Sequence, residues 1–341
     1  DEIDRDLYAV SEQWVSFCAR AKGISSDNTF ALGEEWVFLA AVFRLIRLLR
    51  QSLVDIARQG LPELPAPVTT RPNKQPVVPV LPQNTLDKLL HPGNSAEVWL
   101  VPGSHPDERA AFYRRTSQPG RVALVLGAGN VSTLVPGDVL HAIFVKGQLV
   151  VIKPNPVNDY LGPLIETGFQ ALIRRNFLRV IYGGVAEGNY LSHHPLVEAI
   201  HLTGSDKTFE AIVFGPGAAG QKRKIARQPI LTKPFTAELG SVSPIIVVPG
   251  PWSDREIMTQ ARKIATWLTF NAGFNCLTPR VLIQSANWPQ RHTLNRAIGR
   301  MLAQIETRRA YYPGAHERCA EFLHLNSAGL EFGSGGDGRL P

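Results

Sequence analysis

The first sixty residues carry apolar side chains at the spacing of amphipathic helices. In the segment 39–59, LAAVFRLIRLLRQSLVDIARQ, apolar residues recur every three or four positions with four arginines among them. This periodicity places an apolar stripe along one face of a helix. We therefore expect a helical N-terminal region over residues 1–60. A basic amphipathic helix is compatible with a membrane surface, but packing against the chain itself or a partner subunit is the commoner use of such a face.

The next segment, residues 61–82, is rich in proline. It contains seven prolines in the sequence LPELPAPVTTRPNKQPVVPVLP. Proline fixes φ and donates no backbone hydrogen bond. The composition therefore predicts an extended linker or arm over 61–82 and not a packed element.

Beyond residue 82, short β-rich runs alternate with helix-like runs. The strand candidates are 121–129, 148–154, 178–184, 199–205, 242–248 and 279–284. Helical patterns stand between them at 164–177, 188–198 and about 254–268. Alternation of this kind predicts βαβ units and a parallel sheet. We expect an α/β protein with a parallel-sheet nucleotide-binding domain over 83–236 and the start of an α/β catalytic domain over 237–341.

Composition narrows the class of protein. The 341 residues are 44% apolar and 19% charged, which is typical of a globular chain of about two domains. The apolar run 36–43 is far shorter than the roughly 20 residues that span a membrane, so we expect no membrane span. The acidic start without methionine is not a signal peptide. Three scattered cysteines predict neither a disulfide framework nor a zinc site, and a reducing, cytoplasmic setting is expected.

Charge and histidine content add little. The net charge of +7 is spread along the chain, and only 221–227, QKRKIAR, is a dense basic run. That run is typical of a solvated face, with binding of an anion such as a cofactor phosphate as the alternative. We expect no nucleic-acid partner. His193, His194 and His201 have no carboxylate or cysteine pattern with metal-ligand spacing around them, so we expect surface or helix-end residues and no metal.

Several strand candidates end in polar or glycine-rich sequence. In parallel α/β sheets, ligands bind at the carboxyl ends of the strands, where glycine lets the backbone approach them. The dinucleotide fingerprint GxGxxG is absent, and GAGNVS (127–132) lacks its third glycine. These residues alone indicate an α/β nucleotide-binding protein and leave its function open.

Five motifs in a fixed order resemble the aldehyde dehydrogenase superfamily. They are PGRVALVLGAGN (119–130), VVIKPNP (150–156), HPLVEAIHLTGS (194–205), ELGSVSP (238–244) and FNAGFNC (270–276). The resemblance covers roughly 119–285, about half of the chain. The sequence GNVS followed by KPNPVNDYLGP resembles the divergent branch near long-chain acyl-CoA reductases more than it resembles the common acetaldehyde-oxidising enzymes. The family's catalytic domain continues well beyond its cysteine, so the resemblance also implies a chain truncated at its C-terminus.

The resemblance implies three catalytic residues. Cys276 would be the nucleophile that attacks the aldehyde and carries a thioester after hydride transfer. Asn130 would stabilise the oxyanion with its amide, and Glu238 would act as general base on water. Each has a plainer alternative: most lone cysteines are small buried hydrophobes, asparagine after glycine is a common turn residue, and a glutamate is usually solvated. Glu238 itself is placed at the start of the strand leading to VSP.

The resemblance also implies a cofactor site for NAD or NADP. Lys153 would contact ribose or phosphate, although a lysine at a strand end is usually solvated. The adenosine and pyrophosphate would lie against Gly183, Gly184, Gly188, Thr203, Gly204 and Ser205. Turn chemistry explains the same residues equally well.

Three departures from the family pattern bear on specificity. The acidic residue expected three positions after Lys153 is Pro156, which leaves the choice between NAD and NADP open. The glycine expected five residues after Gly204 is Phe209, which questions the usual pyrophosphate packing. The glutamine expected two residues before the cysteine is Phe274, which indicates either a pocket for an apolar chain or a lost activity.

Three functions follow from this reading. The first is NAD(P)-dependent oxidation of an aldehyde to a carboxylic acid through a Cys276 thioester. The second is the reverse chemistry, reduction of an acyl thioester such as acyl-CoA to an aldehyde. The third is a non-catalytic relative that keeps the fold. The small-molecule partner is then an aldehyde or acyl thioester, and a homo-oligomer is compatible with all three. The tail 327–341 contains EFGSG, a faint echo of a later cofactor motif of the family.

Overall fold

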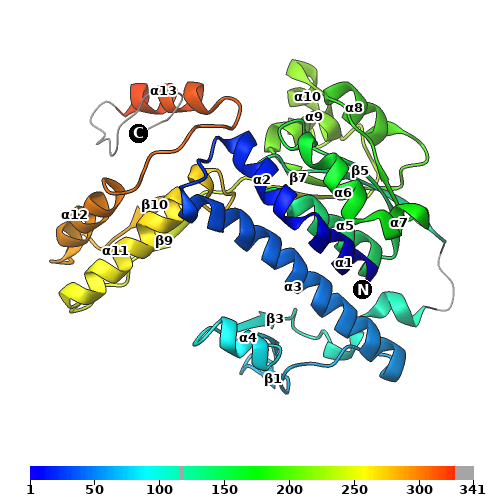
Figure 1. The fold of residues 1–341 in the computed structure, drawn as a ribbon, viewed down its shortest axis with the longest axis horizontal. Helices are drawn as coiled ribbons and strands as arrows, with labels where there is room; N and C mark the ends of the chain where they lie inside the picture. Colours follow the sequence, from blue (N-terminus) through cyan, green and yellow to red (C-terminus); the bar gives the residue numbers. More distant parts are fainter. Residues whose placement is uncertain (116–118, 327–341) are drawn as a thin grey trace.

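The computed structural model describes residues 1–115 and 119–326, and the chain begins with three helices (Figure 1). They are α1 (Glu2–Ala9), α2 (Ser11–Lys22) and α3 (Thr29–Gln59). Gly23 and Gly60 end α2 and α3 in left-handed conformations, which glycine adopts without a Cβ clash. The side chain of Asn28 caps the start of α3. The expected helical N-terminal region is therefore present.

A five-stranded parallel sheet forms the centre of the largest unit. Its strands are β4 (Arg121–Leu126), β5 (Gln148–Lys153), β6 (Leu178–Val180), β7 (Ala199–Gly204) and β8 (Phe235–Leu239). Their order across the sheet is β6-β5-β4-β7-β8, and every pair is parallel. β4 lies in the middle, which is why its last four residues are buried on both faces. The α/β class with a parallel sheet is confirmed.

Helices cover both faces of this sheet (Figure 1). They are α5 (Leu134–Phe144), α6 (Gly162–Gly168), α7 (Gln170–Arg174), α8 (Val185–His193), α9 (Asp206–Phe214) and α10 (Gly217–Ile225). Alternate β4 residues point to opposite faces: Val125 joins the core with α5 and α6, and Leu124 joins a second core with α9.

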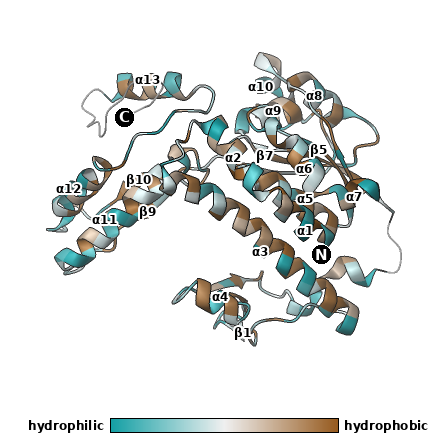
Figure 2. Ribbon diagram, viewed as in Figure 1, coloured by the Kyte–Doolittle hydropathy of each residue, from teal (hydrophilic) through white to brown (hydrophobic). Residues whose placement is uncertain are grey.

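The N-terminal helices belong to the first of these two cores. Trp14 of α2 and Leu39 of α3 are fully buried, and both pack in the cluster that contains Val139 of α5 and Phe169. Figure 2 shows the hydrophobic residues that run along α3. The apolar stripe predicted for 39–59 therefore packs against the chain itself. No helix within the described ranges is long and apolar enough to cross a membrane.

The expectation of an unpacked linker over 61–82 is wrong. β1 (Thr69–Thr70) and β2 (Pro76–Leu81) form an antiparallel sheet with β3 (Ala96–Trp99), and Val77 and Val78 are buried. The prolines are accommodated at tolerated positions. Pro76 is the first residue of β2. The register of β2 against β3 shifts between Pro79 and Leu81, so the backbone N–H that Pro79 lacks falls next to an irregular part of the strand pair.

A smaller α/β unit follows the large sheet. It contains β9 (Ser243–Ile246), α11 (Asp254–Thr269), β10 (Pro279–Ile283) and α12 (Arg291–Leu302). β9 and β10 pair in parallel, and the two helices share a separate core with Leu294 and Ala297 fully buried. The turn η4 (Phe270–Gly273) joins α11 to the segment that carries Cys276, and α13 (Ala315–Leu325) is the last described helix.

One strand lies where the sequence reading did not place it. Glu238 belongs to β8, which is a strand of the large sheet and is distinct from β9. It therefore stands near the end of a strand, where the sequence reading had it at the start of the next. The expected domain boundary between residues 236 and 237 falls inside β8. The division of the chain into a cofactor-binding and a catalytic domain remains a proposal.

Candidate functional site

Most of the candidate residues lie at the carboxyl ends of the parallel strands. Lys153 is the last residue of β5, Gly204 the last of β7, and Glu238 the last but one of β8. Asn130 follows β4 by four residues, and Gly183 follows β6 by three. Because these strands are parallel, their ends meet along one edge of the sheet, which is where ligands bind in such folds.

The structure brings Asn130 against the loop that carries Cys276. Its side-chain amide donates a hydrogen bond from Nδ2 to the Phe274 carbonyl at 2.8 Å. Phe274 is two residues before the cysteine, so the contact joins segments 144 residues apart in sequence. A side-chain amide has two N–H groups, and this bond uses only one of them.

Cys276 is exposed, unlike Cys18, which is buried in the N-terminal core. Its Sγ lies 3.7 Å from Asn275 Oδ1, and its carbonyl accepts a hydrogen bond from the Ser241 hydroxyl at 2.9 Å. The thiol of Cys18 is out of reach, and burial raises its pKa to about 12. Between these two, Cys276 is the thiol that a solvent-borne reagent or substrate reaches.

Glu238 is exposed near the end of β8 and pairs in register with Thr203 of β7. Among the described residues, no hydrogen bond joins its carboxylate to Cys276. The chain connects them indirectly, since Ser241 lies three residues after Glu238 and donates to the Cys276 carbonyl. Glu238 and the cysteine segment are thus tethered at the same end of the sheet.

Lys153 is buried, with 6% of its surface exposed, although it is a charged strand-end residue. Burial lowers the pKa of its ammonium, and the carboxylates of Glu187 and Asp159 partly oppose that effect. In the described ranges its Nζ makes no hydrogen bond or ion pair. The Nζ atom itself reaches solvent at the end of this buried side chain. A positive charge held at this edge of the sheet, without a protein acceptor in the described ranges, favours an oxygen-rich ligand.

The glycines after β6 pack tightly around one carboxylate. The backbone N–H of Gly184 donates to Glu187 Oε2 at 2.6 Å. Gly183 has a φ of 141°, and a Cβ there would meet the Glu187 side chain at 2.5 Å. A Cβ on Gly188 would lie 3.7 Å from the Lys153 chain. The sequence analysis did not single out Glu187. Its place three residues after the N-cap of α8 is that of the glutamate in a capping box, although the glycine N-cap has no side chain to return the second bond.

Thr203 and Ser205 have structural partners. Thr203 Oγ1 donates at 3.3 Å to Oδ2 of Asp138, which lies in α5. Ser205 is the N-cap of α9 and accepts the N–H of Thr208 at 3.1 Å. Turn and capping chemistry therefore accounts for Ser205 without a ligand.

His201 is not the surface residue expected from sequence. It lies in β7, where its Nε2 is 3.4 Å from Asp138 Oδ1 and its Nδ1 is 2.9 Å from Thr236 Oγ1. The hydrogen bond to Asp138 raises the pKa of His201, against a smaller opposing effect of burial. The period-two pattern His201, Thr203 on β7 was the available signal that both side chains face α5.

Two of the aromatic departures pack into the protein. Phe209 contacts Phe235 with ring centroids 5.1 Å apart, inside the core on the α9 face. Phe274 stacks on Tyr312 at 5.8 Å and meets Tyr311 edge-on at 5.0 Å. Its ring is thus part of an aromatic cluster with the segment after α12.

With this geometry in view, comparison with known proteins defines the class. The chain belongs to the aldehyde dehydrogenase family, because the model of that family matches residues 93–305. This range contains β4 to β10 and every candidate catalytic and cofactor residue named above.

Individual relatives agree with this assignment. The chain is 29% identical over 167 residues to N-succinylglutamate 5-semialdehyde dehydrogenase of Sphingopyxis alaskensis, covering 49% of this chain and 32% of the relative. It is 29% identical over 186 residues to the dimeric NADP-preferring aldehyde dehydrogenase of Mus musculus, covering 52% and 37%. The chain thus spans about a third of the length of these curated relatives.

Solved structures show the same fold over nearly the whole chain. The substrate-bound AldH of Staphylococcus aureus matches with a TM-score of 0.62 at 14% identity, covering 98% of this chain and 61% of that one. A putative aldehyde dehydrogenase from Burkholderia cenocepacia matches with a TM-score of 0.62 at 17% identity, covering 99% and 60%.

Proposed function

We propose that this chain carries the chemistry of NAD(P)-dependent aldehyde oxidation, with Cys276 as nucleophile and a carboxylic acid as product. The observation that carries the proposal is the hydrogen bond from Asn130 Nδ2 to the Phe274 carbonyl. It puts an amide donor beside the loop of an exposed cysteine, in a chain of the aldehyde dehydrogenase family. An exposed thiol next to a positioned amide is what carbonyl addition requires.

The first step is attack of the Cys276 thiolate on the aldehyde carbon. The new C–S bond turns the carbonyl oxygen into an oxyanion, and the second N–H of the Asn130 amide supports that charge. Loss of one such donor reduces the rate by roughly 100-fold to 1000-fold in other acyl-transfer enzymes. Asn130 thus has two tasks, holding the Phe274 carbonyl and stabilising the oxyanion.

Once the adduct has lost its hydride and become a thioester, release of the product as an acid requires water. Glu238 is exposed at the same end of the sheet and tethered to the cysteine segment through Ser241, so its carboxylate can take a proton from an attacking water. The C–S bond then breaks, and the acid leaves with the Cys276 thiol restored.

The residues at the strand ends fit a dinucleotide. Lys153 offers an ammonium that has no acceptor among the described residues and reaches solvent at the end of a buried side chain. Gly183 and Gly188 keep the space around Glu187 and Lys153 free of further side chains. A bound nicotinamide supplies the hydride acceptor. Pro156 supplies no carboxylate for the ribose hydroxyls, which is compatible with NADP as well as NAD, and a relative carries the name NADP-preferring.

The test is absorbance at the reduced-nicotinamide band with a panel of aldehydes and either NAD or NADP. Cys276→Ala is the active-site variant, and Cys319→Ala, a half-buried cysteine in α13, is the matched control. We expect a signal that survives Cys319→Ala and is lost in Cys276→Ala. A signal that survives in both variants would refute the proposal. Signal only with acyl-CoA and NADPH would replace it by reduction of an acyl thioester.

A further inference from the structure

The loop that leads into Cys276 has a costly backbone conformation. Asn271 and Ala272 are both left-handed, each with φ of 53°. Residues other than glycine incur a steric cost there, so their surroundings must hold the conformation. The Phe274 N–H donates to the Asn271 carbonyl at 2.9 Å and closes the turn two residues before Cys276. The path of the loop therefore depends on what fixes Asn271.

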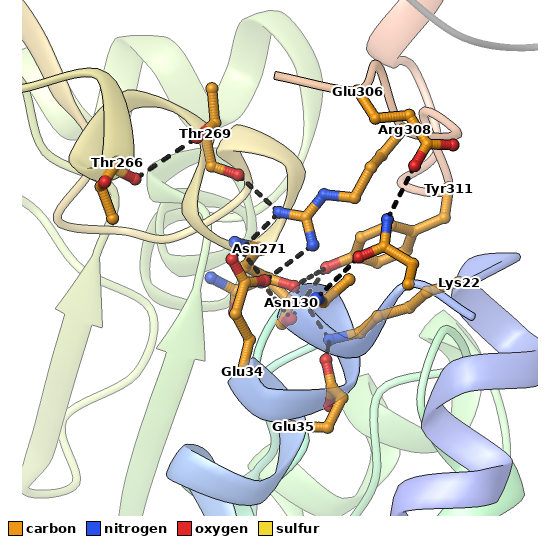
Figure 3. A network of polar contacts seen from close by, with 12 residues as sticks. Lys22, Glu34, Glu35, Asn130, Thr266, Thr269, Asn271, Glu306, Arg308 and Tyr311 are labelled. Carbon is orange, nitrogen blue, oxygen red and sulfur yellow. Dashed lines mark hydrogen bonds and ion pairs between the residues drawn. The ribbon is translucent and has the colours of Figure 1, made fainter. Parts of the chain in front are cut away.

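Asn271 is buried, and each of its polar groups has a partner (Figure 3). Its N–H donates to Glu34 Oε2 at 3.0 Å, and its Nδ2 donates to the Asn130 carbonyl at 2.9 Å. Its Oδ1 accepts from Lys22 Nζ at 2.9 Å and from the Tyr311 hydroxyl at 3.2 Å. Four separate segments of the chain thus converge on this one residue.

Two ion pairs, each with a buried carboxylate, hold these partners in place. Lys22 Nζ lies 2.5 Å from Glu35 Oε1, with the two side chains 3% and 1% exposed. Arg308 lies 2.7 Å from Glu34 and also donates to the Thr269 carbonyl, at the last residue of α11. Buried ion pairs add little net stability, but they fix which groups can meet, since a displaced charge would be left without a partner.

The same network holds the candidate oxyanion donor. The Tyr311 hydroxyl shares its single hydrogen between the Asn130 carbonyl at 2.9 Å and Asn271 Oδ1 at 3.2 Å. The Asn130 amide in turn donates to Phe274 in the cysteine loop. Asn130 and the loop of Cys276 therefore move as one unit only while these contacts are intact.

We propose that this network is a clamp that positions Cys276 relative to Asn130. Its members are Lys22, Glu34, Glu35, Asn271, Arg308 and Tyr311. They are positioning residues, since they act through the loop and through Asn130. The clamp gives the N-terminal helices and the segment after α12 a direct part in the site. Its kinetic consequence rests on the proposed function, whereas its effect on the loop does not.

The most conservative test compares two hydroxyl deletions in one aromatic cluster. Tyr311→Phe removes the bonds to Asn130 and Asn271 and keeps the ring against Phe274. Tyr312→Phe removes a neighbouring hydroxyl and keeps the ring stacked on the same phenylalanine. Both changes leave the aromatic packing in place, so the two variants differ in the network bonds alone.

The first readout is hydrogen exchange of the peptide that covers 270–276. We expect exchange about tenfold faster in Tyr311→Phe, with Tyr312→Phe like the wild type. In turnover assays, Tyr311→Phe should lower kcat about tenfold and leave KM for the cofactor unchanged, because misplacing reacting groups slows chemistry without weakening remote binding. Equal exchange in both variants would overturn the clamp. If Tyr311→Phe alone exchanges faster but the wild type shows no turnover, the clamp stands and the proposed function is overturned.

A second test uses matched ion pairs on α3. The double variant Lys22→Met, Glu35→Gln removes the clamp pair without leaving a charge unpaired. The control double variant Arg44→Met, Asp87→Asn removes another pair with a fully buried carboxylate, far from the cysteine loop in sequence. Only the clamp variant should speed exchange at 270–276. Unchanged exchange at 270–276 in a clamp variant that melts cooperatively would refute the proposal. If the clamp variant does not fold, the comparison of Tyr311→Phe with Tyr312→Phe tests the proposal instead.

Discussion

At the scale of single residues, the polar candidates differ in whether another part of the protein already bonds to them. The Lys153 side chain is buried along its length, and its ammonium has no acceptor in the described part of the chain, which indicates a group available to a ligand. Ser205 is equally prominent in the sequence, yet its hydroxyl caps α9. The difference lies in partners and not in residue type, so it was invisible in the sequence.

The lysine gives a direct prediction. Lys153→Met should raise KM for NAD(P) about tenfold or more, because a charged hydrogen bond to the ligand is worth roughly 1.5–3 kcal/mol. The melting temperature should not fall, since the ammonium has no partner among the residues that the structure describes. Lys146→Met, at an exposed lysine after α5, is the control and should leave KM unchanged. Steady-state kinetics with varied cofactor would contradict the assignment if both variants bound alike.

At the scale of elements, α3 is held to the small antiparallel sheet region by one carboxylate. Asp87 of α4 (Thr85–Leu90) is fully buried and accepts from Arg44 at 2.8 Å and Arg47 at 3.1 Å. Asp87 Oδ2 also accepts a hydrogen bond from the Gln83 N–H at 3.0 Å. The two arginines are a third exposed, so water can take over if the carboxylate is lost.

Asp87 should make the protein sensitive to acid. The hydrogen bond from Arg44, with help from Gln83 and Arg47, lowers the pKa of Asp87 from 3.8 to about 2 against the opposing effect of burial. The stabilisation is therefore complete above pH 3.8 and is lost as pH falls through about 2. Asp87→Asn should cost about 2 kcal/mol at neutral pH, as the size of the pKa shift implies, and flatten that acid limb. Denaturant unfolding of both proteins between pH 5 and 2 measures this, and parallel pH curves would contradict it.

The elements also show where sequence patterns suffice. The strands β4, β5 and β7 and the helices α3 and α11 were predicted because their hydrophobic periodicity is long and regular. β8 was not separated from the next strand, since FTAEL is short and half exposed. The strand β2 was hidden by its prolines, whose tolerance depends on a local register shift that no sequence pattern reports.

The same limit applies to the candidate site. The motif order placed Asn130, Lys153 and Cys276 at strand ends or in loops, as the structure has them. It put Glu238 at the start of the next strand, whereas the structure has it near the end of β8. The clamp around Asn271 could not be predicted, because its members come from four distant segments. Adjacent Glu34 and Glu35 in an otherwise apolar helix stretch were a signal only in retrospect. The sequence tail 327–341 lies outside the described residues, so its EFGSG motif stays a prediction.

At the scale of the whole molecule, the described chain has separate hydrophobic cores on the two faces of the large sheet and in the unit of α11 and α12. The candidate site lies where the sheet and that smaller unit meet, through the Asn130–Phe274 bond. The cysteine loop therefore responds to both, and damage to one core need not unfold the other.

A core substitution tests this division. Leu294 of α12 is fully buried, and Leu294→Ala should cost about 2–5 kcal/mol in its own unit. Hydrogen exchange should rise across α11 and α12, with β4 and β5 still protected. Leu124→Ala, at a fully buried leucine of β4, should give the reverse pattern. Uniform loss of protection in both variants would show a single cooperative unit instead.

The central claim is that Cys276 forms a covalent thioester with the oxidised aldehyde. The most direct measurement is peptide mass after acid quench, using the Glu238→Gln variant with aldehyde and NADP or NAD, because loss of the base slows hydrolysis. The account predicts an acyl adduct on the peptide that contains Cys276, in proportion to reduced cofactor formed in the first turnover. Reduced cofactor without an adduct on that peptide, or an adduct on Cys319, would contradict it.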